Sequence, residues 1–301
     1  MDICTPGDTH AEIAIAALEA GKHVLCEKPL ANTVAEAEAM AEAAARAADK
    51  GVYAMCGFSF RRTPALTYAR QLVAEGRIGS IRHVRAQYLQ DWLADENAPM
   101  AWRLDKSKAG SGALGDIAAH IIDATQWITG QQISAVSGAL RTFVHTRPLA
   151  DASGTGQVTV DDAAAFTAQF SSGALGVFEA TRFATGRKNS LRIELNGSAG
   201  SLAFDFENMN ELSLYETKDG HDAGFRRILV TEPQHPYTGH WWPAGHGLGY
   251  EHGFTHQVVE LIEALAAGKQ PEPSFADALQ VQRVLGAVEA SSQAASTLTG
   301  V

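Results

Sequence analysis

The chain has 301 residues, 46% of them hydrophobic and 19% charged, a composition typical of globular proteins with substantial cores. Its length favours two domains. The formal charge of −10 and the dispersed arginines argue against a nucleic acid or an anionic membrane as a partner. No apolar segment is long enough to span a bilayer and no signal sequence is recognisable, so we expect a cytoplasmic protein.

The first 58 residues predict short strands alternating with helices. The strands are expected over residues 1–5, 23–26 and 52–58, and the helices over 10–20 and 33–50. Asn32 or Thr33 is the expected cap of the second helix. This alternation indicates a parallel sheet of the doubly wound kind. The turn that holds a dinucleotide is a strand followed by Gly-x-Gly-x-x-Gly, and the sequence does not contain it. Residues 110–115 have a similar glycine spacing, but a polar loop rather than a strand precedes them.

Strands dominate the rest of the chain. We expect helices over residues 64–75, 112–130, 251–267 and 275–297, and strands over 81–92, 134–143, 162–170, 174–181, 190–195, 201–206 and 211–215. Short turn sequences between these strands favour antiparallel hairpins. The predicted fold class is therefore α/β, with a partial doubly wound parallel sheet in residues 1–78 and an α+β domain with a large, mostly antiparallel sheet in residues 79–301.

The three cysteines, Cys4, Cys26 and Cys56, each lie within or beside a short apolar run. Because no Cys-x-x-Cys occurs and the number is odd, we expect buried, reduced thiols rather than disulfides or a metal site.

The helix predicted over 112–130 carries the first candidate active-site residues. Asp116 and His120 are four residues apart and Asp123 is three further along, so all three share one side of a helix. A carboxylate in this position is suited to orient an imidazole. A separate apolar stripe allows the helix to pack on a core, and it consists of Ile117, Ile121, Ala124 and Ile128. The alternative is a structural ion-pair network.

Several motifs occur in a fixed order along the whole chain. They are Thr5-Pro6 with His10, Glu27-Lys28-Pro29, Trp102-Arg103, Gly115-Asp116-x-x-x-His120-x-x-Asp123 and the segment 273–277. With this set the chain resembles the Gfo/Idh/MocA oxidoreductases, the group of glucose–fructose oxidoreductase and inositol dehydrogenase. Within that family, the segments 88–92, 106–116, 179–182 and 186–189 are most similar to the levoglucosan dehydrogenase members. The N-terminal half of the family's Rossmann domain has no counterpart in this chain, and we expect it to lie outside the sequence.

The resemblance implies NAD- or NADP-dependent oxidation of a secondary hydroxyl of a sugar, anhydrosugar or cyclitol to a ketone. It assigns catalysis to Lys28, Asp116 and His120. It also implies a homo-oligomer, a dimer or tetramer formed through the C-terminal sheet. The residues that it assigns to the cofactor are Thr5, Pro6, His10, Glu27, Lys28, Pro29, Trp102 and Arg103.

Oxidation of an alcohol requires a base for the hydroxyl proton. His120 is suited to that role near neutral pH, with Asp116 fixing its tautomer. Lys28 can bond the same oxygen and favour the alkoxide, or act as the immediate base itself. Sequence does not separate these two assignments.

The predicted substrate-binding set combines polar groups with an aromatic ring, the mixture that sugar hydroxyls and a sugar's apolar face require. Arg182, Asn189 and Tyr250 are weaker candidates of the same kind. The set itself consists of Lys28, Gln90, Asp91, Trp92, Asp116, His120 and Asp123.

A cluster of histidines near two tryptophans raises the question of a metal. The histidines are His235, His240, His246, His252 and His256. No two-ligand motif with an accompanying glutamate base is present, so we expect no metal, and instead a loop over the sugar cleft or at a subunit interface.

Two alternative functions remain at this point. One is an NAD-dependent epimerase, isomerase or glycosidase-like member of the same family. The other is a cofactor-free sugar-binding protein.

Overall fold

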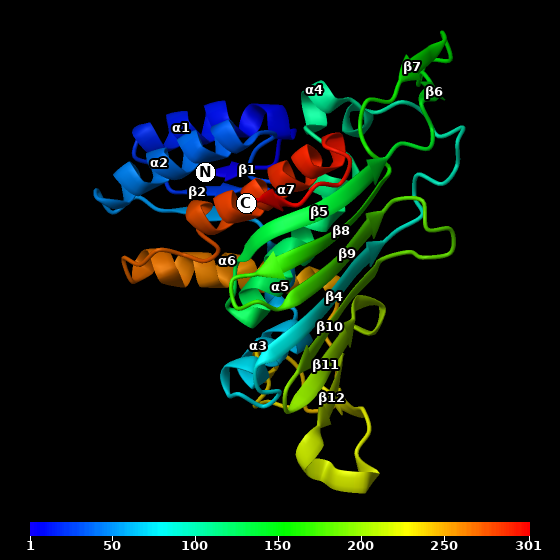
Figure 1. The fold of residues 1–301 in the computed structure, drawn as a ribbon. Helices are drawn as coiled ribbons and strands as arrows, with labels where there is room; N and C mark the ends of the chain where they lie inside the picture. Colours follow the sequence, from blue (N-terminus) through cyan, green and yellow to red (C-terminus); the bar gives the residue numbers. More distant parts are fainter.

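A three-stranded parallel sheet is formed by the N-terminal residues of the chain, in the order β1 (Asp2–Ile3), β2 (Val24–Cys26) and β3 (Ala54–Cys56). The structure is a computed structural model that describes residues 1–301. Helices α1 (His10–Glu19) and α2 (Val34–Ala48) connect these strands (Figure 1). Thr33 caps α2 through a reciprocal capping box with Glu36. The predicted βα alternation is confirmed.

A nine-stranded sheet forms the larger part of the molecule, with the order β13-β12-β11-β10-β4-β9-β8-β5-β14 (Figure 1). Every neighbouring pair is antiparallel except β4 and β9, which run parallel. The predicted mostly antiparallel sheet is therefore confirmed. The strands are β4 (Ile81–Leu89), β5 (Ile133–Arg141), β8 (Ala163–Phe170), β9 (Leu175–Thr181), β10 (Ser190–Gly197), β11 (Gly200–Asp205), β12 (Glu211–Glu216), β13 (Arg226–Leu229) and β14 (Thr299–Gly300).

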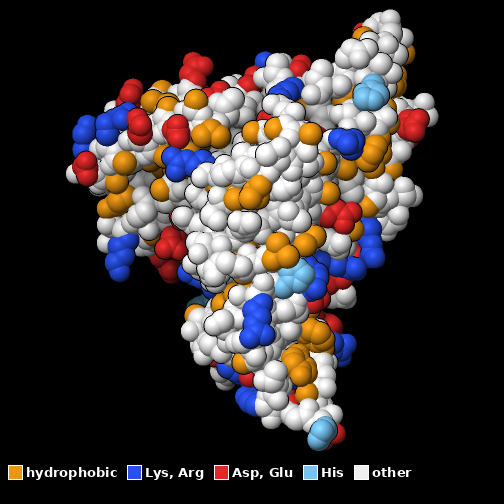
Figure 2. Space-filling model, viewed as in Figure 1, with side chains coloured by type: hydrophobic (Ala, Val, Ile, Leu, Met, Phe, Trp, Pro, Cys, Tyr) orange, Lys and Arg blue, Asp and Glu red, His pale blue; other side chains and the backbone are white.

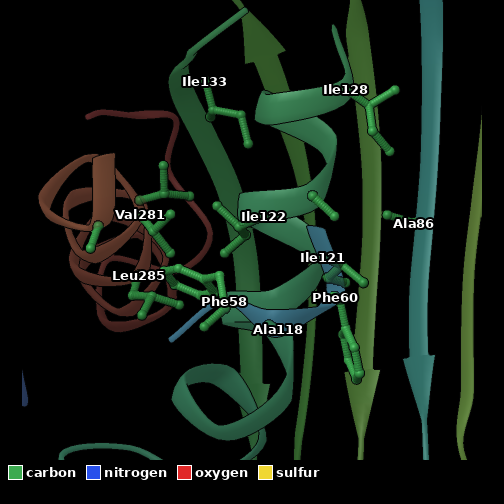
Figure 3. Close-up of a cluster of buried hydrophobic side chains, with 14 of the residues drawn as sticks. Phe58, Phe60, Ala86, Ala118, Ile121, Ile122, Ile128, Ile133, Val281 and Leu285 are labelled. Atoms are coloured by element: carbon green, nitrogen blue, oxygen red, sulfur yellow. The ribbon is translucent and has the colours of Figure 1, made fainter. Parts of the chain in front are cut away.

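Helices cover one face of this sheet and join it to the parallel sheet. They are α3 (Pro64–Ala74), α5 (Ala119–Thr129) and α7 (Phe275–Gln293). In Figure 3, Ile122 of α5 lies on the side of Val281 and Leu285 of α7, whereas Ile121 lies on the side of Ala86 of β4. Since α7 also packs against α2 and β3, one continuous hydrophobic core extends across both sheets.

Short elements were missed by the sequence patterns. They are α4 (Lys106–Ala109), the hairpin of β6 (Thr146–Pro148) and β7 (Thr155–Gln157), and the edge strands β13 and β14. None exceeds four residues, which is too short for a helical or strand period to be read. The last long helix outside the core is α6 (Tyr250–Ala266). None of the helices combines the length and the apolar character required to cross a membrane.

The predicted helix over 112–130 begins with a π-helical turn, Leu114–Ala118, before α5. Asp116 lies within this turn. The start of the helix is fixed by the carboxylate of Asp161, which accepts hydrogen bonds from the amides of Gly112 (2.7 Å) and Leu114 (2.8 Å). π turns of this kind are frequent at functional sites.

The thiols of Cys26 and Cys56 are free and buried, as predicted. The prediction is wrong for Cys4, which is exposed. Strand β1 ends at Ile3, so Cys4 lies beyond the edge of the sheet and borders a cavity there.

Candidate active site

Lys28 and Asp116 meet between the two sheets. Lys28 follows the carboxyl end of β2, where ligands of parallel sheets commonly bind. Its Nζ donates to the carbonyl oxygen of Asp116 at 2.7 Å and lies 3.4 Å from Asp116 Oδ1. On the other side of the carboxylate, Arg182 Nη1 lies 3.5 Å from Asp116 Oδ2. Asp116 is therefore held between two cations.

The charge of Asp116 follows from these neighbours. Burial alone would raise the pKa of its carboxyl, but Lys28, Arg182 and Arg103 outweigh burial and bring the pKa below its usual value. The side chain is thus a carboxylate at neutral pH.

His120 lies in an aromatic surrounding one helical turn away. Its ring centre is 4.6 Å from that of Phe60, 5.9 Å from Tyr88 and 6.2 Å from Phe58. Burial, and secondarily the nearby charge of Lys28, lower the pKa of His120 well below its usual range. The imidazole is therefore neutral at neutral pH, and its buried Nδ1 has no hydrogen-bond partner. A neutral ring with a free nitrogen can accept a proton.

The expectation that Asp116 orients His120 is not met. Asp116 pairs with Lys28 and Arg182, and no hydrogen bond joins it to His120. Asp116 lies in the π turn at Leu114–Ala118, and its carboxylate is directed to the two cations rather than to the imidazole.

A first cavity, of about 210 Å³, opens on one side of Lys28 and Asp116. Every residue predicted to bind the cofactor lines it except Pro6, which directly precedes the lining residue Gly7. The buried ring of His10 joins the loops after β1 and β2, with its nitrogens 2.9 Å from Thr5 O and 3.1 Å from Pro29 O. The lining residues from that prediction are Thr5, His10, Glu27, Lys28, Pro29, Trp102 and Arg103.

A second cavity, of about 410 Å³, opens on the other side and contains His120. The two cavities share Glu27, Lys28, Arg103 and Asp116. The wall of the second cavity is otherwise aromatic and polar, formed by Gly57, Ser59, Phe60, Tyr88, Gln90, Trp92, Ile117, Tyr250 and Phe254.

A hydrogen-bonded chain fixes the polar part of this wall. Tyr88 Oη donates to Asn189 Oδ1 (2.7 Å), and Gln90 Nε2 donates to the same oxygen (3.0 Å). Trp92 Nε1 in turn donates to Gln90 Oε1 (3.0 Å), leaving the indole ring partly exposed beside the cavity. Gln90 and Trp92 are thus held in defined orientations.

Two predicted substrate-binding residues do not line either cavity. Asp91 points to the other side of its segment, where it accepts from Lys188 Nζ (2.7 Å) and the amide of Gly186 (3.0 Å). Strand β4 ends at Leu89 and the chain turns at Trp92, and within this segment Asp91 is held outside the cavity by its bonds to Lys188 and Gly186. Asp123 is buried one turn beyond His120 and forms a two-bond ion pair with Arg61, at 2.5 and 2.9 Å. Asp123 is held within the core rather than in the cleft.

Other cavity residues were not recognised from the sequence. Tyr88 could have been found from the strand alternation, because it precedes Gln90 by two residues and so shares its side. Phe60 and Phe254 carried no such signal, since single aromatic residues are usually part of a core. Of the weaker candidates, Tyr250 lines the second cavity, Arg182 lines the first and Asn189 holds Gln90.

The C-terminal histidines form aromatic and hydrogen-bonded contacts outside both cavities. Trp241 Nε1 donates to His256 Nε2 (2.7 Å), and Tyr237 stacks on the His256 ring at 4.3 Å. His252 Nδ1 accepts from the amide of Gly249 (3.0 Å). No group of three or more His, Cys, Asp or Glu side chains is arranged to hold a metal ion.

Residues 1–56 match the family described as "Oxidoreductase family, NAD-binding Rossmann fold", and residues 66–203 match "GFO/IDH/MocA C-terminal domain". The levoglucosan dehydrogenase of Pseudarthrobacter phenanthrenivorans is 44% identical over 301 residues, covering 96% of this chain and 76% of that protein. Scyllo-inositol 2-dehydrogenase (NAD(+)) of Bacillus subtilis is 31% identical over 66% of this chain and 53% of that enzyme.

Solved structures agree with these matches. An oxidoreductase domain protein from Kribbella flavida superimposes with a TM-score of 0.97 and 69% identity, covering all of this chain and 79% of that one. A levoglucosan dehydrogenase in complex with NADH and levoglucosan gives a TM-score of 0.94 and 44% identity, with the same coverage. The predicted fold class and the predicted nicotinamide cofactor are confirmed. The chain belongs to the Gfo/Idh/MocA family of NAD-binding oxidoreductases.

Proposed function

We propose that this protein oxidises a secondary hydroxyl of levoglucosan, or of a closely related anhydrosugar or cyclitol, with NAD. One observation carries the proposal: two cavities of different character meet at Lys28 and Asp116. Such an arrangement allows a nicotinamide ring and a sugar to approach each other directly at the same two side chains. The relatives named levoglucosan dehydrogenase support the choice of substrate.

The first cavity fits the nicotinamide end of the cofactor. Pro29 and Trp102 provide flat apolar surfaces, and the buried Oδ1 of Asn32, which has no hydrogen-bond partner, is an acceptor available to an amide group. When bound, NAD supplies the hydride acceptor. Thr5 and His10 shape the inner wall, while Trp102 and Arg103 enter from the opposite side.

The second cavity fits the sugar. The partly exposed ring of Trp92 offers an apolar face for the pyranose C–H bonds, and Gln90 offers an oriented amide for a hydroxyl. Tyr250 and Phe254 of α6 close the far side.

The proton of the reacting hydroxyl is handled by His120 and Lys28. The neutral ring of His120 lines the second cavity and can accept the proton, and the Lys28 ammonium favours the developing alkoxide. Asp116 orients Lys28 through the contact at 3.4 Å and balances its charge.

The direct test is to incubate the protein with NAD and levoglucosan, glucose or myo-inositol and to follow NADH absorbance. We expect levoglucosan to give the highest kcat/KM. An isomerised sugar without net NADH would instead indicate the epimerase alternative. Calorimetric binding of sugar without any binding of NAD would indicate the cofactor-free alternative, and either result would overturn the proposal.

We also propose that a second copy of the chain covers the open face of the nine-stranded sheet. Leu175 and Val177 of β9 expose 49% and 42% of their surface there, and hydrophobic side chains occur across the face seen in Figure 2. Light scattering at several concentrations tests this, with Val177→Lys expected to favour the monomer. A wild-type protein that is monomeric at all concentrations would contradict it.

A further inference from the structure

Arg182 is a fully buried charged side chain that the proposed chemistry does not use. It follows directly after β9, and none of its side chain is exposed. Nη2 donates to the carbonyl oxygen of Asp161 (3.0 Å), but Nε and Nη1 are buried without a hydrogen-bond partner. Unpaired donors on a buried cation are unfavourable for folding, so a purely structural role explains this residue poorly.

Two further contacts of the guanidinium are with residues of the proposed site. Nη1 lies 3.5 Å from Asp116 Oδ2, and the guanidinium carbon lies 5.5 Å from the ring centre of Trp92. The first contact is an ion pair with the carboxylate that holds Lys28. The second is a cation–π contact with the ring assigned to the sugar.

The turn that leads to Asp116 is shaped around this guanidinium. A Cβ atom at Gly112 would lie 1.7 Å from the carbonyl oxygen of Asp161 and 2.8 Å from Arg182 Nη2. The carboxylate of Asp161 holds the amides of Gly112 and Leu114. Arg182 and the start of the helix that carries Asp116 are therefore connected through Asp161.

The Lys28 side chain, in contrast, is 16% exposed and borders both cavities. Its ammonium now contacts the Asp116 carbonyl and carboxylate, and it must reorient towards a substrate oxygen to act on it. After that movement, Arg182 is the fixed cation in direct contact with the carboxylate. The other ionisable groups around the site lie on several elements. They are Cys4 and His10 in the first cavity, Glu27 beside Lys28, Arg103 from the facing loop, Tyr88 of β4, His120 of α5, Tyr250 of α6, and Asp161, which contacts Arg182 directly.

We infer that Arg182 is a positioning residue that keeps Asp116 charged and in place while Lys28 acts on the substrate, and that it also holds the Trp92 ring beside the sugar. This inference rests on the proposed function. Arg182 thereby connects Asp116, which holds Lys28, with Trp92 on the wall of the second cavity.

The test compares Arg182→Gln and Arg182→Lys with wild type. In Arg182→Gln we expect kcat/KM to fall on the order of 10- to 100-fold, the acid limb of the pH profile to move to higher pH, and KM for the sugar to rise. Arg182→Lys retains the charge but not the planar guanidinium. Relative to Arg182→Gln, we therefore expect its acid limb to return towards the wild-type pH, whereas its KM for the sugar should recover less.

Arg147→Gln is the matched control. Arg147 is equally buried, donates to the carbonyl oxygens of Leu93 and Asp95, and stacks on Phe183, but it contacts no active-site carboxylate. This variant should lose stability without moving the acid limb. An unchanged pH profile and KM in Arg182→Gln, or an equal shift in Arg147→Gln, would overturn the inference.

A second measurement does not depend on activity. Carbon-13 NMR of the carboxyl groups follows the titration of Asp116, with Asp116→Asn identifying its signal. The midpoint should rise in Arg182→Gln and remain unchanged in Arg147→Gln. If no sugar is oxidised but this midpoint still rises, the proposed function fails while the electrostatic role of Arg182 holds; an unmoved midpoint refutes that role.

Discussion

At the residue scale, Lys28 has the most direct effect on the proposed reaction, because both cavities include it. Replacing it with Met removes the ammonium but keeps much of the side-chain length. We expect Lys28→Met to lower kcat/KM by roughly 10²- to 10⁴-fold, the usual contribution of a positioned acid–base group, in initial rates of NADH formation.

Lys188→Met is the control for this variant. Lys188 is an exposed lysine near the site that pairs with Asp91 rather than with a cavity residue. Its loss should leave the rates nearly unchanged. Equal losses in the two variants would show that general surface charge, and not Lys28 itself, controls activity.

The second residue-scale prediction concerns pH and His120. Its pKa is lowered in the folded protein, so below about pH 6.5 the unfolded chain takes up a proton that the native His120 does not. The free energy of unfolding should therefore decrease as the pH falls through this range, by at most about 1.4 kcal/mol per pH unit from this group.

Urea unfolding of wild type and His120→Gln at pH 7.5 and 5.5 measures this contribution. The variant should lose less stability between the two pH values than the wild type. If both lose the same amount, His120 is not held neutral by its surroundings.

Residue types and order were enough to predict that Lys28, Asp116 and His120 lie around one cavity. Lys28, Asp116 and His120 meet as expected, but their pairing differs because ion-pair partners depend on three-dimensional direction. Asp91 is predicted to bind substrate from the polar and aromatic mixture at 90–92, and Asp123 from the helix side that it shares with Asp116 and His120. Lys188 holds the first outside the cavity, and the buried cation of Arg61 holds the second.

At the scale of elements, the turn before α5 determines where Asp116 points. Gly112→Ala would place a methyl group 1.7 Å from a backbone oxygen, which no side-chain rotation can relieve. We expect a loss of about 2–4 kcal/mol in the free energy of unfolding, together with a fall in kcat/KM. Gly154→Ala is the control, because its Cβ would meet no atom within 4 Å. Similar stability of the two variants would contradict this account.

The Arg61–Asp123 pair stabilises α5 against the segment Ser59–Arg62. Removing one partner leaves a buried unpaired charge, so Asp123→Ala should cost about 3–5 kcal/mol of unfolding free energy. KM for the sugar should change little, because Asp123 is outside the second cavity. A raised KM without a loss of stability would restore the original assignment of Asp123 to the substrate.

Element types were predictable where a period could be read. The alternating burial along β8 and the capping box of α2 are both visible in the sequence. The π turn was not, because the same residues also satisfy a regular helical period. The parallel pairing of β4 with β9 joins strands far apart in sequence, and no local pattern encodes it.

At the scale of the whole molecule, the proposed reaction centre lies where the loop after β2 meets the π turn that precedes α5. The loops of the parallel sheet contribute Lys28 and one side of the first cavity, and the segment after β4 of the large sheet contributes Gln90 and Trp92 to the wall of the second. Helix α7 packs against elements of both sheets. Division of the chain into an α/β part and an α+β part was predictable from strand and helix order, whereas this shared core was not.

The most direct measurement of the central claim follows hydrogen from the sugar to the cofactor. Levoglucosan carrying deuterium on its carbons is incubated with the protein and NAD, and the reduced cofactor is analysed by mass spectrometry. If the two cavities meet at Lys28 and Asp116 as proposed, one deuterium appears in the reduced nicotinamide in each turnover, and Lys28→Met largely abolishes the transfer. Reduced cofactor without the label, or no reduced cofactor from any sugar tested, would contradict the account.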